Sequence, residues 1–366
     1  MIQAQQLPLK HLVCWLGLGA VAALAACSRT SLDDDDAVPA TEKRSDSRCP
    51  RRTIAPDPLS GIEAKHLSLE RWLEWTGRKH DLDEVLLSSD EIADLNASLG
   101  VSRPPIKPQI DLRSPIDPQQ IVATVAERVS SIRSQLESGS LVLPGHQALS
   151  REEDSALAQR ASITETRPAF RIAVAPIQVR CAPFALVLQA REENGLDPSI
   201  DRNSCGSVRP QEALQPLAEW PNGMVLVRTR FGIGWIDKST SLALAIPPEA
   251  AAPFLAGPYS RLASQAVLRA GDSSSATLPA GTLVPSAKNS VVFATSTGLH
   301  HLEIPPSDGL TSTRRPLTRR MLLEEAWRAL GLPFGFGDQN GGRDCSRTIL
   351  DILESFAIRL PRHSAW

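Results

Sequence analysis

The residues best suited to chemistry lie near the C-terminal end of the sequence, in Arg343-Asp344-Cys345-Ser346. Four glycines occur between positions 334 and 342, and glycine permits the turns and close approaches that bring a loop beside a reactive group. The residues after the cysteine repeat apolar side chains at helical spacing: Ile349, Ile352, Leu353 and Phe356. Because Asp344 is a suitable N-cap, the pattern predicts that Cys345 lies in the first turn of a helix.

A cysteine in that position can act as a nucleophile. The free N–H groups and the positive end of the helix dipole favour the thiolate over the thiol, and the thiolate is the attacking species. The alternative is a small, buried and inert cysteine, which is how most free cysteines behave. Cys345 is therefore the candidate catalytic residue, and its surroundings must decide between the two interpretations.

The sequence predicts neither a metal nor a cofactor. His300-His301 is the one histidine pair, but adjacent residues of a strand point to opposite faces and cannot chelate together. We find no second cluster of cysteine, histidine or carboxylate residues at ligand spacing.

Further short sequence motifs lie on both sides of the cysteine, in a definite order. A predicted helix spans 319–330 and ends at Gly331, a natural C-terminal glycine. Next come Leu332-Pro333-Phe334-Gly335-Phe336-Gly337, the cysteine segment, and Ile358-Arg359-Leu360-Pro361-Arg362-His363-Ser364. This ordered set resembles the start of an NlpC/p60 catalytic domain, a papain-like family of cysteine peptidases that cleave cell-wall peptides.

The resemblance covers 315–366 and implies roles for three residues. Cys345 would be the nucleophile, while Asp344 and Ser346 would line the subsite for the amino-terminal end of a peptidoglycan stem peptide. The chain departs from the family pattern in having Arg347 where a glycine usually follows the Cys-Ser pair.

The family's general base is a histidine on a strand several dozen residues beyond the cysteine. Here only His363 follows Cys345, in the variable position of the Leu-Pro-Arg-x-Ser segment, and we interpret it as a surface or substrate-rim residue. A thiolate–imidazole pair needs an imidazole within hydrogen-bond reach. The sequence therefore predicts a C-terminally truncated, inactive domain, in which the apolar face of the cysteine helix has little to pack on.

The N-terminal residues 1–26 are predicted to be a lipoprotein signal peptide. Leu12 to Ala26 is an apolar stretch too short for a typical membrane span, and it ends in Leu-Ala-Ala before Cys27. That ending resembles the bacterial lipoprotein box, in which the cysteine is lipidated; an apolar helix of a cytosolic domain is the alternative. The following residues, 27–56, are predicted to be a disordered tether. The resemblance implies an exported protein anchored by its acyl chains, in the outer membrane and facing the periplasm.

The remaining chain indicates an α+β, multidomain protein. Residues 57–150 are predicted to be a helical stabilising region, in which Asp117-Pro118 starts the clearest helix. Residues 165–248 contain short β-type runs, among them Phe184–Leu188, Met224–Arg228 and Gly234–Asp237. We expect a second β block at 255–312, a linker at Pro305–Arg315, and the catalytic fragment at 315–366.

Both β blocks are predicted to be SH3-like barrels. A tryptophan hairpin from Trp220, a strand and a Gly-Trp-Ile ending at Ile236 resemble bacterial SH3-like domains, although any small β-barrel is an alternative. Trp220 and Trp235 are expected in the core. Cys181 and Cys205 are candidates for a disulfide, with Cys49 left over, but spacing does not fix the pairing.

Charge excludes one class of partner. The formal net charge of −2 and the absence of a concentrated basic face argue against nucleic acid. The resemblance implies peptidoglycan stem peptides as the partner, together with the membrane through the lipid anchor. Two functions are compatible with these patterns. One is a stem-peptide endopeptidase by family, inactive as given, and the other is a non-catalytic lipoprotein that binds the cell wall or a partner protein.

Overall fold

Several helices begin at a residue whose side chain caps the first turn. In the computed structural model, the backbone N–H of Ser88 donates to Glu91 and that of Glu91 donates to the Ser88 hydroxyl, which completes a capping box. Asp117 caps the helix Pro118–Glu137 by accepting from two backbone N–H groups of its first turn. The start at Asp117 agrees with the sequence prediction.

The chain divides into two compact units, Met1–Glu74 and Trp75–Trp366. The structure describes the following residues: 64–99, 109–192, 195–196, 200–270, 274–288, 290–303 and 309–362. The predicted signal peptide with Cys27, the tether with Cys49, and His363 lie outside the described residues. Within the described ranges, none of the helices has both the length and the apolar character needed to span a membrane.

Ten helical segments occur in the described residues. The α-helices are α2 (Leu69–Gly77), α3 (Ser89–Leu99), α4 (Pro118–Glu137), α5 (Arg151–Ala158), α6 (Pro248–Ala256), α7 (Arg319–Ala329) and α8 (Cys345–Glu354). The 3-10 helices are η1 (Ala64–Leu67), η2 (Pro144–His146) and η3 (Phe336–Gly341).

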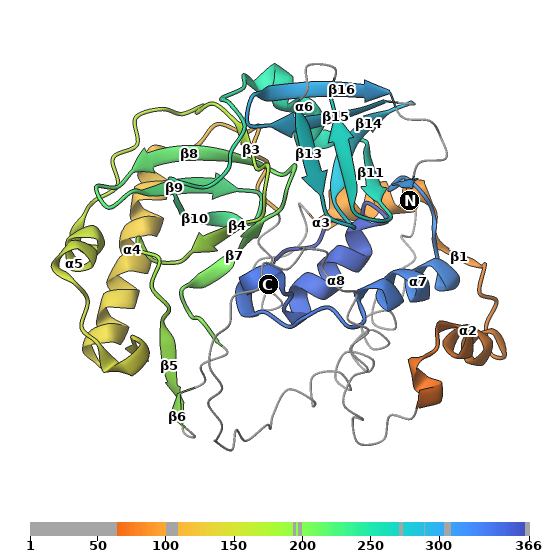
Figure 1. Cartoon of the computed structure of the whole chain (residues 1–366), viewed down its shortest axis with the longest axis horizontal. Helices are drawn as coiled ribbons and strands as arrows, with labels where there is room; N and C mark the ends of the chain where they lie inside the picture. The colour runs from red at the N-terminus through yellow and green to blue at the C-terminus, as the bar shows by residue number, and fades with distance from the viewer. Residues whose placement is uncertain are drawn as a thin grey trace, which may run out of the picture. The chain divides into compact units, whose positions relative to one another are not determined.

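Two antiparallel sheets carry most of the strands (Figure 1). The six-stranded sheet has the order β3 (Arg171–Ile172), β8 (Ala213–Glu219), β9 (Met224–Thr229), β10 (Gly232–Asp237), β4 (Ile177–Arg180) and β7 (Ser204–Val208). The five-stranded sheet has the order β16 (Gly298–Glu303), β15 (Ser290–Thr295), β14 (Leu283–Ala287), β11 (Tyr259–Leu262) and β17 (Leu310–Ser312). The structure is thus a mixed α+β fold, as predicted.

Three small antiparallel sheets complete the described strands. They are β1 (Val85–Leu87) with β18 (Leu317–Thr318), β12 (Ala266–Arg269) with β13 (Ser275–Leu278), and β2 (Leu141–Val142) with β5 (Gln189–Glu192) and β6 (Gly195–Leu196).

Two strand boundaries differ from the sequence predictions. Phe184–Leu188 is not a strand, because the buried side chain of Asn203 donates to the carbonyls of Phe184 and Leu186 at 2.9 and 2.7 Å and holds the segment in a bend. The predicted linker Pro305–Arg315 is also partly wrong. Within it, β17 pairs with β11, whose backbone groups at that edge are thereby satisfied.

The six-stranded sheet packs against α4. The buried apolar residues of that helix share one core with both tryptophans of the sheet hairpin: Ile121, Val125, Val129, Ile132, Trp220 and Trp235. The two indole rings meet edge to face with centroids 5.6 Å apart. Both tryptophans are thus core residues, as predicted, and a disulfide joins Cys181 to Cys205 at the edge of the sheet.

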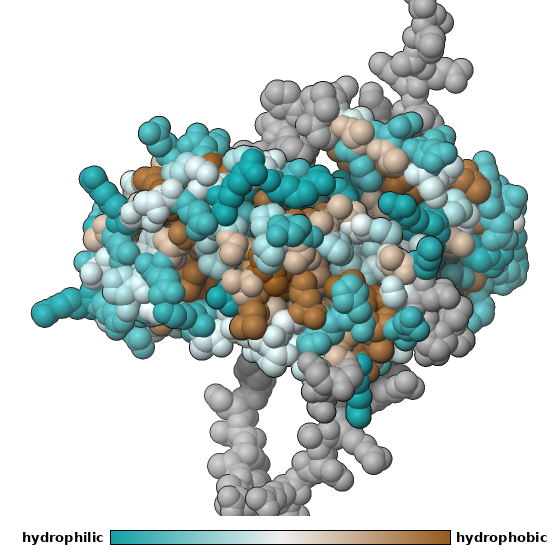
Figure 2. All heavy atoms as spheres, turned by 90° about the horizontal axis from the view of Figure 1, so that it is seen from above, coloured by the Kyte–Doolittle hydropathy of each residue, from teal (hydrophilic) through white to brown (hydrophobic). Residues whose placement is uncertain are grey.

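One glutamine joins the two large sheets. Gln211 is buried with a positive φ of 70°, and its side-chain amide donates to the carbonyl of Ala294 while its oxygen accepts from the N–H of Ala294, at 3.2 and 2.7 Å. The side-chain amide of Gln211, in the turn before β8, thus makes the same pair of hydrogen bonds to β15 that the backbone of a neighbouring strand would make. Polar side chains cover most of the face seen in Figure 2, and apolar ones gather near its middle.

Candidate functional site

Cys345 is the first residue of α8, as the sequence predicted. Asp344 is the N-cap, and its Oδ1 accepts from the backbone N–H of Arg347 at 2.8 Å. The thiol is free and exposed, and Ser346 follows it in the first helical turn, half-buried. The sulfur therefore lies at the N-terminal end of α8, where the first backbone N–H groups of a helix have no intrahelical partner.

The glycine-rich loop before the cysteine lies against β7. Gly337 has a φ of 58°, and a Cβ at this position would lie 2.4 Å from the hydroxyl of Ser204. Its carbonyl accepts from that hydroxyl and from the side-chain amide of Gln178, both at 2.9 Å. The glycine is therefore required by close backbone approach as well as by conformation.

Asp338 is the buried acid of this loop. One carboxylate oxygen accepts from the hydroxyl of Ser207 on β7 and the other from Nη2 of Arg362, each at 3.0 Å. Burial raises the pKa of Asp338 above its ordinary value, and the positive charge of Arg362 opposes that rise without cancelling it. The loop, the sheet and the C-terminal segment thus meet at one side chain.

Arg362 grips the helix cap itself. Its Nη1 donates to Oδ1 of Asp344 at 3.0 Å and its Nη2 donates to Oδ2 at 2.7 Å, which is the parallel fork that Arg and carboxylate groups form. The backbone N–H of Gly337 also donates to Oδ2, at 3.3 Å. The backbone N–H of Arg347 donates to Oδ1, so four donors in all contact this carboxylate.

A network of ion pairs holds the far side of α8 against the six-stranded sheet. Its members are Arg343, Arg347, Asp351 and Glu354 from the catalytic fragment, and Arg209, Glu212 and Arg230 from the turns of the sheet. Nη1 of Arg230 lies 2.5 Å from Glu354, and Nε of Arg343 lies 2.6 Å from Asp351. Burial works against the charged form of Arg230, but Glu212 and Glu354 outweigh it and raise its pKa.

Arg347 stands at the position where a glycine was expected, and the network accounts for it. Only 1% of its side chain is exposed, and its Nε lies 3.0 Å from Asp351. Its guanidinium also lies over the ring of Phe231. The departure from the family pattern is therefore accommodated by acidic and aromatic partners.

The apolar face of α8 is buried, contrary to the expectation that it has little to pack on. Leu353 and Phe356 share a core with Ile92 of α3, Leu317 of β18 and Ile358. The helical region supplies part of this cover through Ile92, and β18 supplies another part through Leu317.

Asn96 of α3 fastens the chain that leaves α8. Its side-chain amide donates to the carbonyl of Ala357, and its oxygen accepts from the N–H of Arg359, both at 2.8 Å. Sequence reasoning missed both Asn96 and Arg362. Arg362 is the arginine of the Leu-Pro-Arg-x-Ser motif, which could have identified it, but no local sequence pattern indicates Asn96.

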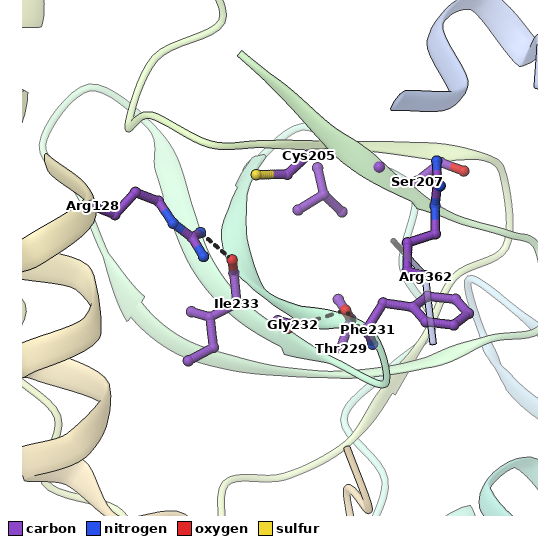
Figure 3. A pocket seen from close by; sticks show the side chains of 10 residues that line it. Arg128, Cys205, Ser207, Thr229, Phe231, Gly232, Ile233 and Arg362 are labelled. Carbon is purple, nitrogen blue, oxygen red and sulfur yellow. Dashed lines mark hydrogen bonds between the residues drawn. The ribbon is translucent and has the colours of Figure 1, made fainter. Parts of the chain in front are cut away.

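Two cavities lie apart from the sulfur. A cavity of about 60 Å³ is enclosed between Arg128 and Arg362, which enter from opposite sides, and Arg128 donates to the carbonyl of Ile233 there (Figure 3). The other, of about 370 Å³, lies between the end of α4 and β2. Neither is lined by Cys345, so the sulfur faces open surface.

Among the residues that the structure describes, no hydrogen bond joins the Cys345 thiol to an imidazole. In the same ranges, no group of three or more His, Cys, Asp or Glu side chains is placed to hold a metal ion.

The fold is similar to that of one solved NlpC/P60 endopeptidase. An NlpC/P60 endopeptidase from Photobacterium damselae subsp. piscicida superimposes with a TM-score of 0.58 at 16% identity, covering 78% of this chain and 66% of that one. This chain thus spans just under two thirds of that structure's length. An NlpC/P60 family protein from Bacillus cereus gives a TM-score of 0.39 at 16% identity, over 54% of this chain and 75% of that one. No protein-family model and no curated protein matches the sequence.

Proposed function

We propose that the protein is an exported, lipid-anchored protein of the NlpC/P60 endopeptidase type, directed at the stem peptides of peptidoglycan. The observation that carries this proposal is the exposed, free thiol of Cys345 at the first position of α8. The likeness in fold to an NlpC/P60 endopeptidase supports it. The two β blocks are proposed to act as SH3-like modules beside the catalytic fragment.

The proposed chemistry is nucleophilic and needs no cofactor. The Cys345 thiolate attacks the carbonyl carbon of an amide next to a D-amino acid, the amine leaves, and water releases the acyl group from the sulfur. Ser346 is proposed to face the amino-terminal side of the bound peptide, from its place in the first turn of the helix. The leaving amine needs a proton, and an imidazole is the usual donor.

We infer that this protein chain does not hydrolyse stem peptides by itself. The support for this inference is that none of the described histidines hydrogen-bonds to the Cys345 sulfur. Without a base, a thiol at neutral pH reacts only through its small thiolate fraction. The proposed nucleophile is thus exposed without an imidazole partner among the described residues.

The test pairs a reaction with a labelling measurement. We expect purified protein to hydrolyse no defined stem peptide above the level of a Cys345→Ala variant, while iodoacetamide modifies Cys345 of the parent, a site located by mass spectrometry of the peptides and lost in the variant. A variant of an exposed residue elsewhere, such as Gln119→Ala, serves as the control for handling. Turnover that disappears in Cys345→Ala would refute the inference of inactivity, and failure of the thiol to label would refute the nucleophile.

A second function is favoured by the lack of an imidazole partner at the sulfur among the described residues. In it the protein binds the cell wall or a partner protein through its sheets and performs no catalysis. Co-sedimentation with purified peptidoglycan distinguishes the two: binding that survives Cys345→Ala and blocked thiols supports this function. Binding that is lost on alkylation of Cys345 supports the peptidase-type site.

A further inference from the structure

We propose that this site takes peptides whose amino end is amide-linked, and that Arg362 is the residue that sets this specificity. The inference rests on the proposed function and refines its substrate class. The stem-peptide subsite was expected to use Asp344 for the amino-terminal end of the peptide. A positively charged amine there would need a carboxylate with spare acceptor capacity and uncompensated negative charge.

Asp344 offers neither. A carboxylate has about four lone-pair sites, and the four donors on Asp344 occupy them at 2.7 to 3.3 Å. Arg362 supplies two of these donors and also a full positive charge in contact with both oxygens. Only 15% of the Asp344 side chain and 3% of the Arg362 side chain are exposed, so solvent screens this pair weakly.

No neighbouring carboxylate of the described residues replaces it. Asp338 is buried and bonded to Ser207 and Arg362. Asp351, one helical turn or more into α8, is paired with Arg343 and Arg347. An ammonium brought to the start of α8 would therefore lose water without gaining a carboxylate that has spare acceptor capacity, which is unfavourable.

A neutral amide at the same place has no such cost. It carries no charge to be repelled, and it can exchange hydrogen bonds with exposed groups such as the Ser346 hydroxyl. Peptidoglycan stem peptides have an amide at their amino end while they remain attached to the glycan chain, and an ammonium after they are released. The geometry points to the attached form as the ligand, so the reaction that frees the peptide from the glycan need not come first.

The experiment compares two probes on the full chain carrying Cys345→Ala, so that nothing is consumed. The probes are a stem peptide with a free amino terminus and the same peptide N-acetylated, titrated calorimetrically at neutral pH. We expect the acetylated peptide to bind at least as tightly as the free one. In Arg362→Gln, where no guanidinium compensates the Asp344 carboxylate, we expect the free amine to bind about tenfold tighter than the acetylated peptide, as for a new charge-assisted hydrogen bond.

Asp344→Asn keeps the outcome decisive if Arg362→Gln does not fold, and the double variant completes the test if it does. In Asp344→Asn, which preserves shape, the ratio of the two dissociation constants should stay the same, because the carboxylate does not contact the amine. In Arg362→Gln combined with Asp344→Asn, the gained preference should vanish. A parent that prefers the free amine, with that preference lost in Asp344→Asn, overturns the inference. Absence of binding by both probes instead counts against the proposed function.

Discussion

Arg362 holds both carboxylate oxygens of Asp344, at 3.0 and 2.7 Å, across 18 residues of chain. The contact joins the end of the catalytic fragment to the cap of the helix that carries Cys345. Because the same guanidinium also reaches Asp338 in the glycine-rich loop, three segments are fixed by one side chain. Such a fork is rigid, since both groups are planar and two parallel hydrogen bonds define their relative orientation.

The pH dependence of stability should reveal the buried acid of this junction. Burial raises the folded-state pKa of Asp338 above 3.8, with Arg362 opposing. A carboxyl with a raised pKa stabilises the fold when protonated, below its unfolded pKa, and loses that contribution as pH rises through the folded pKa. We therefore expect the unfolding free energy of the parent, minus that of Asp338→Asn, to fall as pH is raised from about 3 to about 7.

Urea unfolding at a series of pH values measures this difference. Asp83→Asn is a suitable comparison, because its exposed carboxyl has a pKa lowered mainly by its hydrogen bond with Arg320. The unfolding free energy of the parent, minus that of Asp83→Asn, should rise as pH is raised through the acid range. A rising difference for Asp338→Asn as well would show that Arg362 outweighs burial.

The contribution of the Gln211–Ala294 hydrogen bonds to stability can be measured separately. Removing the Gln211 side chain leaves the N–H and carbonyl of Ala294 buried without their partners. We expect Gln211→Ala to lower the unfolding free energy by about 2 to 4 kcal/mol, from two groups at 1 to 3 kcal/mol each with partial recovery by water. Gln119→Ala, at an exposed position of α4, should change it by less than about 0.5 kcal/mol.

Chemical denaturation of both variants provides the measurement. Equal, small effects from Gln211→Ala and Gln119→Ala would mean that the sheets are held together by their apolar contacts, and that the amide pair adds nothing.

The proposed anchor rests on Cys27 and is tested by fractionation. Lipid attachment at this residue would place the protein in membranes, since two or more acyl chains give stable binding. We expect Cys27→Ala to move the protein from the membrane to the soluble periplasmic fraction. Cys49→Ala, in the predicted tether, should stay with the membranes. An unchanged distribution of Cys27→Ala would remove the lipoprotein assignment.

Sequence reasoning succeeded where the signal was local. The helix start at Cys345 follows from Asp344 and the apolar spacing after it, and the hairpin strands follow from Trp220, Trp235 and the turn residues. Caps and turns are decided by neighbours in the chain, so their patterns survive in a single sequence.

It failed where distant partners decide the outcome. Phe184–Leu188 has strand-like composition, yet Asn203 captures its carbonyls. The apolar side chains of α7 are only half-buried, whereas Glu325 on that helix is buried among three arginines: Arg261, Arg315 and Arg328. A buried acid with remote partners leaves no periodic trace.

The contact between α3 and α8 sets a limit on how this molecule can be divided. Ile92 and Asn96 come from the helical region, yet they form part of the floor beneath the cysteine helix. A fragment that starts after residue 99 would lose Ile92, which covers part of Leu353 and Phe356. It would also lose both hydrogen bonds of Asn96 to the chain that leaves α8. The helical region is thus a structural half of the thiol site, and the smallest unit that can present a well-oriented sulfur must include it.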